Sequence, residues 1–214
     1  MDLSTIEFGS LLSYSPRGTS DLEQYSRTWM LHLKNDRPVL NPPISMSEYV
    51  SKIIKNTMTT SPFTYFFKVN PILVPIPKSS LMKPETLWVP QRLANALVQN
   101  GLGITVEECL KRVMPLRKAA TSLPMNRPKA SEHYDSLGVR KMLSEPREML
   151  LIDDVITRGA TIIGAANKLH DAFPAVHIRA LAAIRTISTQ NLTAIYDPCI
   201  GQITLEGQYT SRRP

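Results

Sequence analysis

In the second half of the chain, apolar runs alternate with a segment whose apolar residues recur at helical spacing. Met149 to Ile152 and Val176 to Ile184 are mainly apolar, as expected for strands buried on both faces. Between them, apolar residues recur at the spacing of one helix face, namely Ile162, Ala166, Leu169 and Phe173. This pattern predicts a strand, a helix and a second strand, the repeating unit of a parallel sheet.

A similar unit lies upstream. An apolar strand is predicted from Pro71, and it should end early or lie where N–H groups are not needed, because Pro75 and Pro77 cannot donate to a ladder. Helical spacing from Trp88 to Asn100, followed by Gly101, predicts an amphipathic crossover helix with a glycine stop. This order of elements predicts an α/β fold with a doubly wound, mainly parallel sheet, whose ligand lies beyond the carboxyl ends of the strands.

The first part of the chain differs in character. We expect residues 1 to 70, with a helix through Arg27 to Leu33, to form an N-terminal cap or hood on a core of residues 71 to 214, in one compact unit. The tail from Tyr196 to Leu205 is expected to add an edge strand, with the arginines at 212 and 213 free or folded back.

Composition excludes few classes of protein. A chain of 214 residues can bury one sizeable core, no apolar run reaches the ~20 residues of a membrane span, and the N-terminus lacks a signal pattern. We therefore expect a cytoplasmic protein with no membrane partner. The formal charge of +7 fits either nucleic acid or a pocket for a polyanionic small molecule. Nucleic acid stays open but is not favoured, because the basic residues are dispersed without an aromatic-basic repeat.

The two cysteines have no metal-binding or disulfide spacing. Cys109 and Cys199 are most simply read as buried small apolar residues. The four histidines show no paired ligand motif, so we expect no metal held directly by the protein.

Chemistry concentrates just after the apolar run that begins at Met149. Asp153 and Asp154 precede a strand-to-helix turn whose first backbone N–H groups have no helical partner and can bind an anion. Gly159 lets the backbone come close to a ligand, and the hydroxyls of Thr157 and Thr161 can add hydrogen bonds. Because carboxylates repel phosphate, the pair of acids fits a neutral diol, with the phosphate further along the turn. A ribose 5-phosphate has this arrangement.

The segment from Met149 to Thr161 resembles the phosphoribosyl diphosphate (PRPP) signature of type I phosphoribosyltransferases: four apolar residues, two acids, an apolar residue, then a Thr- and Gly-rich loop. Arg158 departs from it, since a small hydroxyl residue is more usual there, but Arg keeps the backbone N–H. The resemblance implies that the two acids hold the ribose hydroxyls. It further implies that the 5-phosphate is bound by Thr157, Arg158, Gly159, Ala160 and Thr161.

A second motif matches the family's pyrophosphate loop, which follows the first core strand. Pro77, Lys78 and Ser79 occupy the matching place. The Val-Pro-Ile-Pro sequence of this motif most resembles the ComF-like branch of the family, which is associated with competence for DNA uptake. Members of that branch usually carry a zinc ribbon of four cysteines, which this chain lacks. The alternative for this motif is an ordinary turn before Pro84.

The long polar segment from Arg117 to Ser136 has no sustained periodicity, and loops of that length are usually functional or disordered. In the resembling family a flexible loop near this place closes over PRPP. Arg117 and Lys118 are therefore candidate catalytic residues that stabilise the leaving pyrophosphate. Other candidates in the segment are Arg127, Lys129 and His133. A solvated basic loop is the alternative for each of them.

The resemblance implies a phosphoribosyltransferase in which a nitrogenous acceptor displaces pyrophosphate from PRPP. Mg²⁺ is the implied cofactor, held by PRPP itself, and Asp153 or Asp154 is a candidate for contact with it through water. The acceptor is unidentified, and homodimers are frequent among relatives. Two alternatives stay open: a PRPP- or nucleotide-sensing protein without turnover, and an accessory protein of DNA uptake or phage defence. An aromatic cluster can stack on a base or, as we favour, pack in the core: Phe63, Tyr65, Phe66 and Phe67.

Overall fold

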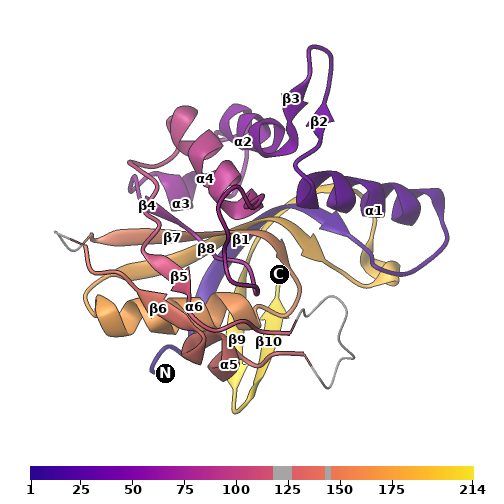
Figure 1. Ribbon diagram of the computed structural model, residues 1–214. Coiled ribbons are helices and arrows are strands. Elements are labelled where there is room, and N and C mark those ends of the chain that lie inside the picture. The colour runs from indigo at the N-terminus through magenta and orange to yellow at the C-terminus, as the bar shows by residue number, and fades with distance from the viewer. Residues whose placement is uncertain (118–126, 143–145) are drawn as a thin grey trace.

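The computed structural model describes residues 1–117, 127–142 and 146–214, and its centre is a six-stranded sheet with helices on both faces (Figure 1). Four strands run parallel. They are β1 (Thr5–Tyr14), β8 (His177–Thr186), β7 (Glu148–Ile156) and β4 (Ile72–Pro75). Two antiparallel strands, β9 (Tyr196–Glu206) and β10 (Tyr209–Arg213), complete the order β10-β9-β1-β8-β7-β4. The predicted α/β class with a mainly parallel sheet is confirmed.

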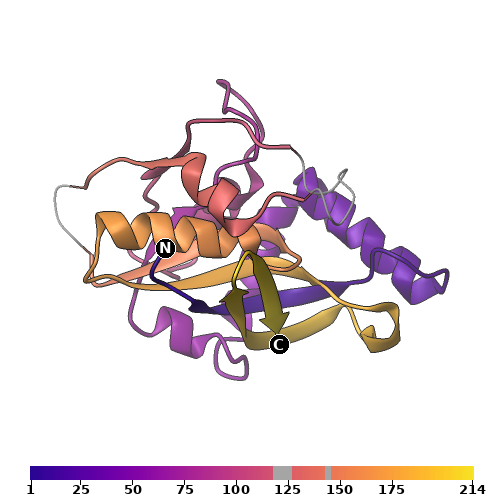
Figure 2. The ribbon, with the colours of Figure 1, turned by 90° about the horizontal axis from the view of Figure 1, so that it is seen from below.

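The helices divide between the two faces of the sheet, as seen from below in Figure 2. One face carries α6 (Ala160–Ala172) and α5 (Ala130–Asp135). The other carries α1 (Asp21–Lys34), α2 (Met46–Asn56), α3 (Thr64–Phe67) and α4 (Val89–Gln99). Two short ribbons lie outside the main sheet: β2 (Pro38–Val39) with β3 (Ile44–Ser45), and β5 (Leu110–Arg112) with β6 (Leu137–Val139). A 3₁₀ turn spans Thr189–Asn191.

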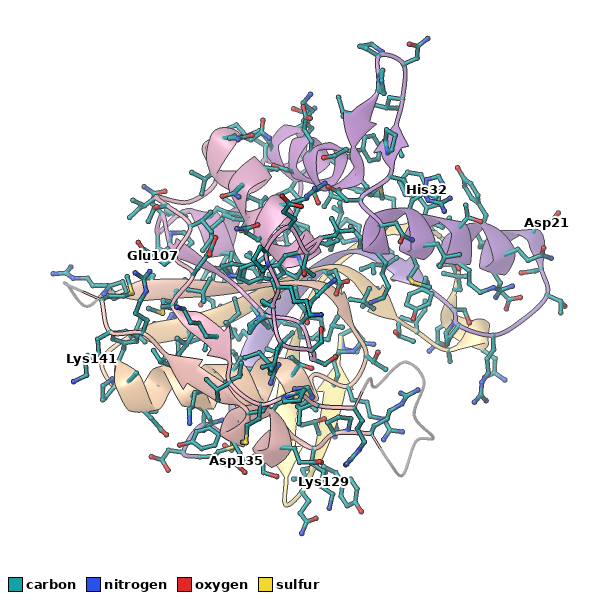
Figure 3. The ribbon with its side chains drawn as sticks, viewed as in Figure 1. Asp21, His32, Glu107, Lys129, Asp135 and Lys141 are labelled. Carbon is teal, nitrogen blue, oxygen red and sulfur yellow. The ribbon has the colours of Figure 1, made fainter. Side chains whose placement is uncertain are left out.

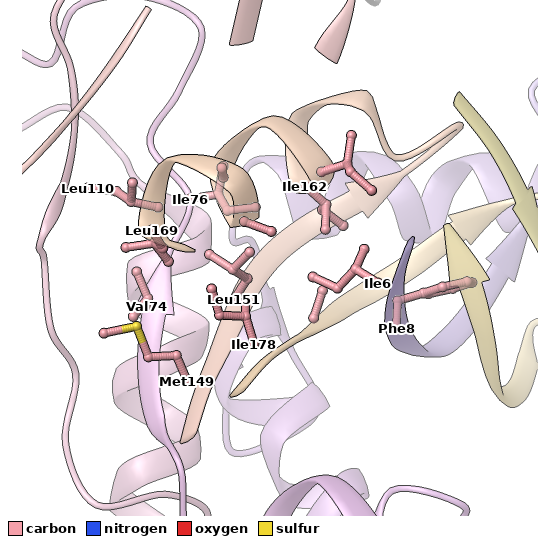
Figure 4. Close-up of a cluster of buried hydrophobic side chains, with 14 of the residues drawn as sticks. Ile6, Phe8, Val74, Ile76, Leu110, Met149, Leu151, Ile162, Leu169 and Ile178 are labelled. Atoms are coloured by element: carbon pink, nitrogen blue, oxygen red, sulfur yellow. The ribbon is translucent and has the colours of Figure 1, made fainter. Parts of the chain in front are cut away.

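Strand β7 is buried on both sides, which explains its continuous apolar run. Met149 and Leu151 pack into the cluster under α6 that Figure 4 shows. Leu150 and Ile152 point to the opposite face and join the cluster under α2 and α4. All four side chains are at most 1% exposed. Successive residues of a strand face opposite sides, so both layers of helix are held by one strand.

The first strand of the chain corrects the expected division at residue 70. β1 lies inside the main sheet, parallel to β8 and antiparallel to β9, and is not part of a cap. The sequence pattern of β1 did not predict a core strand, because small residues such as Gly9 and Ser10 interrupt the apolar run of a strand buried on both faces. A Cβ at Gly9 would lie 2.6 Å from the Phe66 ring. The helices α1 to α3 that follow do cover one face of the sheet, as Figure 1 shows.

The tail also differs from expectation. β9 lies within the sheet, between β1 and β10, and β10 forms the edge instead. Upstream, two predictions are confirmed: β4 ends at Pro75, and α4 ends before Gly101, which has a φ of 73°. Part of the segment expected to be an irregular loop forms the short helix α5. Among the described residues, no helix has the length and hydropathy to cross a membrane.

Candidate functional site

The acid pair lies where β7 extends beyond its neighbour β4. Pro75, the last residue of β4, pairs with Ile152, and the Ile76 N–H donates to the Ile152 carbonyl at 2.9 Å. β7 then continues beside β8 to Ile156. Asp153 and Asp154 therefore lie at the carboxyl edge of the sheet, as the strand order predicted. Both side chains are half-buried there.

Lys34, at the end of α1, joins this site. Its Nζ lies 3.3 Å from Oδ2 of Asp154. Burial raises the pKa of Asp153 well above its usual range, and the neighbouring Asp154 adds to the shift. Burial opposes the charge of Lys34, but Asp154 and Asp153 outweigh it and raise the pKa of the ammonium. The sequence offered no sign of Lys34, since nothing local links α1 to β7.

The turn after the acids has the geometry that the sequence predicted. Gly159 adopts a left-handed φ of 86° directly before α6. A Cβ there would lie 2.7 Å from two carbons of Ile203, so both the backbone conformation and the packing require glycine. The first N–H groups of α6 lack partners within the helix and lie at the positive end of its dipole. Residues 157 to 161 thus form a turn suited to an anion.

Side chains from distant segments support this turn. Thr157 and Arg158 are exposed, and the Thr157 carbonyl accepts a hydrogen bond of 2.9 Å from Nε of Arg212 in β10. The same guanidinium donates to the Thr186 carbonyl at the end of β8, at 2.5 Å. Of the two outcomes left open for Arg212, it is therefore folded back, and it joins the carboxyl ends of β7 and β8.

His133 contacts the other end of the turn. Its Nε2 lies 3.3 Å from Oγ1 of Thr161, and its side chain is 5% exposed. Burial lowers the pKa of His133 to about 4, with a smaller effect from the Arg112 charge. This corrects the expectation that His133 supplies positive charge to pyrophosphate, because a neutral buried imidazole cannot do so.

The Pro77–Ser79 loop is held in place by Arg112 of β5, a residue that no sequence motif indicated. Nε of Arg112 donates to the Lys78 carbonyl at 2.9 Å, and Nη2 donates to the Pro77 carbonyl at 3.4 Å. Burial lowers the pKa of Arg112 to about 10. The Lys78 side chain is exposed, while Pro77 is buried and Ser79 is half-buried. Because this loop follows β4, it emerges at the same edge of the sheet as the acid pair.

The predicted basic loop is described only at its ends. Arg117 pairs with Glu132 of α5, with 2.7 Å between Nη2 and Oε1. Lys118 lies outside the described residues. Lys129 stands at the start of α5 and Asp135 is its last residue, as Figure 3 shows, and the Lys129 ammonium donates to Gln208. The described contacts therefore place Arg117 and Lys129 around α5.

One hollow near the site has a volume of about 770 Å³. It lies between Pro77, Trp88 and strand β5, on the side of the Pro77–Ser79 loop that Arg112 occupies, and its lining does not include the acid pair. A smaller hollow of about 310 Å³ is lined by Ser15 to Arg17, after β1, and by Ile187, Ser188 and Gln190, after β8. Both hollows therefore include residues that follow the carboxyl ends of strands parallel to β7.

Other candidate features are structural. Phe63 and Phe66 are fully buried, and Tyr65 bonds to Glu7 near the start of β1, at the opposite end of the sheet from the acids. The favoured core role is confirmed for Phe63, Phe66 and Phe67, whereas Tyr65 is exposed. Cys109 is buried as expected, whereas Cys199 is half-buried and lies 3.4 Å from the Ser10 hydroxyl. Within the described ranges, no three His, Cys, Asp or Glu side chains gather in a metal-binding group.

No protein-family model matches the chain, and no curated protein matches it. Solved structures do match, among them a hypoxanthine phosphoribosyltransferase from Staphylococcus aureus, at 11% identity over 67% of this chain and 75% of that one, with a TM-score of 0.34. A hypoxanthine phosphoribosyl transferase from Trypanosoma cruzi matches at 13% identity over 90% of this chain and 92% of that one, with a TM-score of 0.33. With TM-scores well below 0.5, these similarities carry no argument about activity, substrate or assembly.

Proposed function

We propose that the protein is a phosphoribosyltransferase that binds PRPP with Mg²⁺ and transfers the ribose 5-phosphate group to a nitrogenous acceptor. One observation carries the proposal: a single edge of the sheet combines two adjacent acids, the N-terminus of α6 behind Gly159, and the loop that bears Lys78. These three groups match a ligand that has a diol between two phosphate-bearing ends.

Each part of the site has a distinct role in this proposal. Asp153 and Asp154 accept hydrogen bonds from the 2- and 3-hydroxyls of the ribose. The amides at the start of α6 and the Thr161 hydroxyl bind the 5-phosphate. Lys78 and neighbouring amides bind the pyrophosphate. Rate acceleration then comes from positioning and from negative charge near a ribose ring that becomes cationic as the C1 bond breaks.

The residues present are compatible with Mg²⁺. Asp153 and Asp154 supply carboxylate oxygens, the ligands that Mg²⁺ prefers, although Lys34 already holds one oxygen of Asp154. Mg²⁺ bound with PRPP would offset charge on the departing pyrophosphate. The two carboxylates are too few for a complete metal site by themselves, which agrees with a metal that arrives with its diphosphate ligand.

Calorimetric titration with PRPP, with and without Mg²⁺, tests the proposal. The parent should bind PRPP in a Mg²⁺-dependent manner, and the Asp153→Asn, Asp154→Asn double variant should lose this binding. The variant should fold normally, because the change removes the mutual repulsion that contributes to the raised pKa of Asp153. A matched control neutralises two exposed acids outside the site, Asp21→Asn with Asp135→Asn.

Three outcomes separate the alternatives. Undiminished PRPP binding by the double variant would show that the site is assigned wrongly. No binding by the well-folded parent would overturn the proposed function. If the parent binds PRPP, release of pyrophosphate in the presence of a panel of bases and amines distinguishes transfer from binding without turnover.

A further inference from the structure

His133 is a buried polar group that the proposed mechanism does not use. It lies on α5, outside the turn, yet its Nε2 is 3.3 Å from Oγ1 of Thr161. The other ring nitrogen, Nδ1, is buried and has no hydrogen-bond partner among the residues that the structure describes. A buried polar atom without a partner is uncommon and needs a physical reason.

The packing of α5 on α6 fixes the position of the imidazole. A Cβ at Gly164 of α6 would lie 2.6 Å from the Ala130 carbonyl and 2.8 Å from the His133 Cβ, so the two helices meet at van der Waals contact. The next residue, Tyr134, donates to Asp171, and the Lys168 ammonium lies 4.3 Å from the centre of the Tyr134 ring. Ala130 and Tyr134, which precede and follow His133 in α5, both contact α6, and they thus hold the imidazole against Thr161.

The neutral ring can meet Thr161 in two ways, and they differ in cost. If the Thr161 hydroxyl donated to Nε2, the proton would sit on Nδ1 and leave a buried N–H without an acceptor. If Nε2–H donates to Thr161, Nδ1 carries only a lone pair. Orphaned buried N–H groups are rarer than under-satisfied acceptors, which favours the second arrangement.

We propose that His133 is a positioning residue of the phosphate site: its Nε2–H donates to Oγ1 of Thr161, so the Thr161 proton is left to donate to a phosphate oxygen of the ligand. The inference rests on the proposed function, because it assumes that a sugar phosphate binds at the turn. It also makes Thr161 selective for a group that only accepts hydrogen bonds, as a phosphate dianion does.

Two variants test this role by calorimetry, with ribose 5-phosphate and ribose as probes. His133→Leu removes the donor and should weaken ribose 5-phosphate binding about tenfold, the size of one lost hydrogen bond to a charged group. His133→Gln places an amide N–H₂ near the position of Nε2 and should restore most of the affinity. The weak binding of ribose should stay the same in both variants. The matched control is His170→Leu, because His170 lies in the last turn of α6, away from Thr161 in the first turn.

Nitrogen NMR of the free protein tests the tautomer directly and needs no ligand. We expect a protonated Nε2 and a bare Nδ1 for His133. A protonated Nδ1 would overturn the proposal, as would equal ribose 5-phosphate affinity in the parent and His133→Leu, or a Gln variant as impaired as the Leu variant. Failure of the parent to bind ribose 5-phosphate would instead overturn the proposed function, and with it the role of His133 in ligand binding.

Discussion

The Lys34 ammonium and the Asp154 carboxylate form an ion pair of 3.3 Å although 120 residues separate them in the chain. The pair links α1, which covers one face of the sheet, to the carboxyl end of β7. It also places one positive charge beside two adjacent acids, one of which has a raised pKa. The site is therefore partly neutralised before any ligand arrives.

Replacing Lys34 should expose the repulsion between the two acids. We expect Lys34→Met to lower the free energy of unfolding by about 1 kcal/mol, the upper range for a pair that is partly open to solvent. The loss should shrink in an Asp154→Asn background, which urea denaturation of the four proteins would measure. Lys52→Met, which breaks the exposed pair with Glu48 on α2, is the control and should change stability by a few tenths of a kcal/mol. An equal loss in both Asp154 backgrounds would contradict the coupling.

Gly159 combines two requirements that substitutions can separate. Gly159→Ala should destabilise the protein by roughly 2 kcal/mol or more, because alanine is strained at a φ of 86° and its Cβ would meet Ile203 at 2.7 Å. Adding Ile203→Ala to Gly159→Ala removes only the steric contribution to this loss of stability. Gly207→Ala tests the conformational part by itself, because Gly207 also has a positive φ of 61° but open space around it. Gly159→Ala no more harmful than Gly207→Ala would show that the contact with Ile203 is unimportant.

Arg212 should stabilise the turn of residues 157 to 161 through its backbone carbonyls. Arg212→Met removes the bonds to the Thr157 and Thr186 carbonyls, at a cost of about 1–3 kcal/mol for hydrogen bonds from a charged donor. Hydrogen exchange should then increase in residues 157 to 161 more than in the centre of β7. The neighbouring Arg213→Met, at an exposed position, should leave exchange unchanged. Uniformly faster exchange across the whole sheet would point to a loss of global stability instead.

The buried His133 predicts a stability that falls on acidification. Its pKa is about 4 in the folded protein against an ordinary value of 6.5, so between these values the unfolded chain binds more protons. The free energy of unfolding should therefore decrease as the pH drops from 6.5 to 4, by roughly 3 kcal/mol from this group. Denaturant titrations at several pH values would show a shallower dependence in His133→Gln than in the parent. His170→Gln serves as the control, and identical pH profiles for parent and His133→Gln would contradict the assignment.

The predictions from sequence succeeded for elements that depend on local residues. Strand β7, helices α4 and α6 and the turn at Gly159 were all predictable, because each depends on neighbouring residues: an apolar run, a helical period, or a glycine in a left-handed turn. Strand β1 was not predictable. Its buried serines and glycine are not typical of a core strand. Its place in the core follows only from its pairing with β8 and β9 on either side.

The candidate site divides in the same way. Asp153, Asp154 and the turn to Thr161 follow one another in the chain, so the amino-acid sequence alone determined that two acids precede a helix N-terminus. Folding alone determined which side chains complete the site: Lys34, His133 and Arg212 contact the acids and the turn, and Arg112 holds the Pro77–Ser79 loop. These four residues come from four other elements. The physical reason is range: strand and turn formation depends on contacts between near neighbours, whereas these charges and hydrogen bonds reach the site only through the order of the sheet and the packing of helices on it.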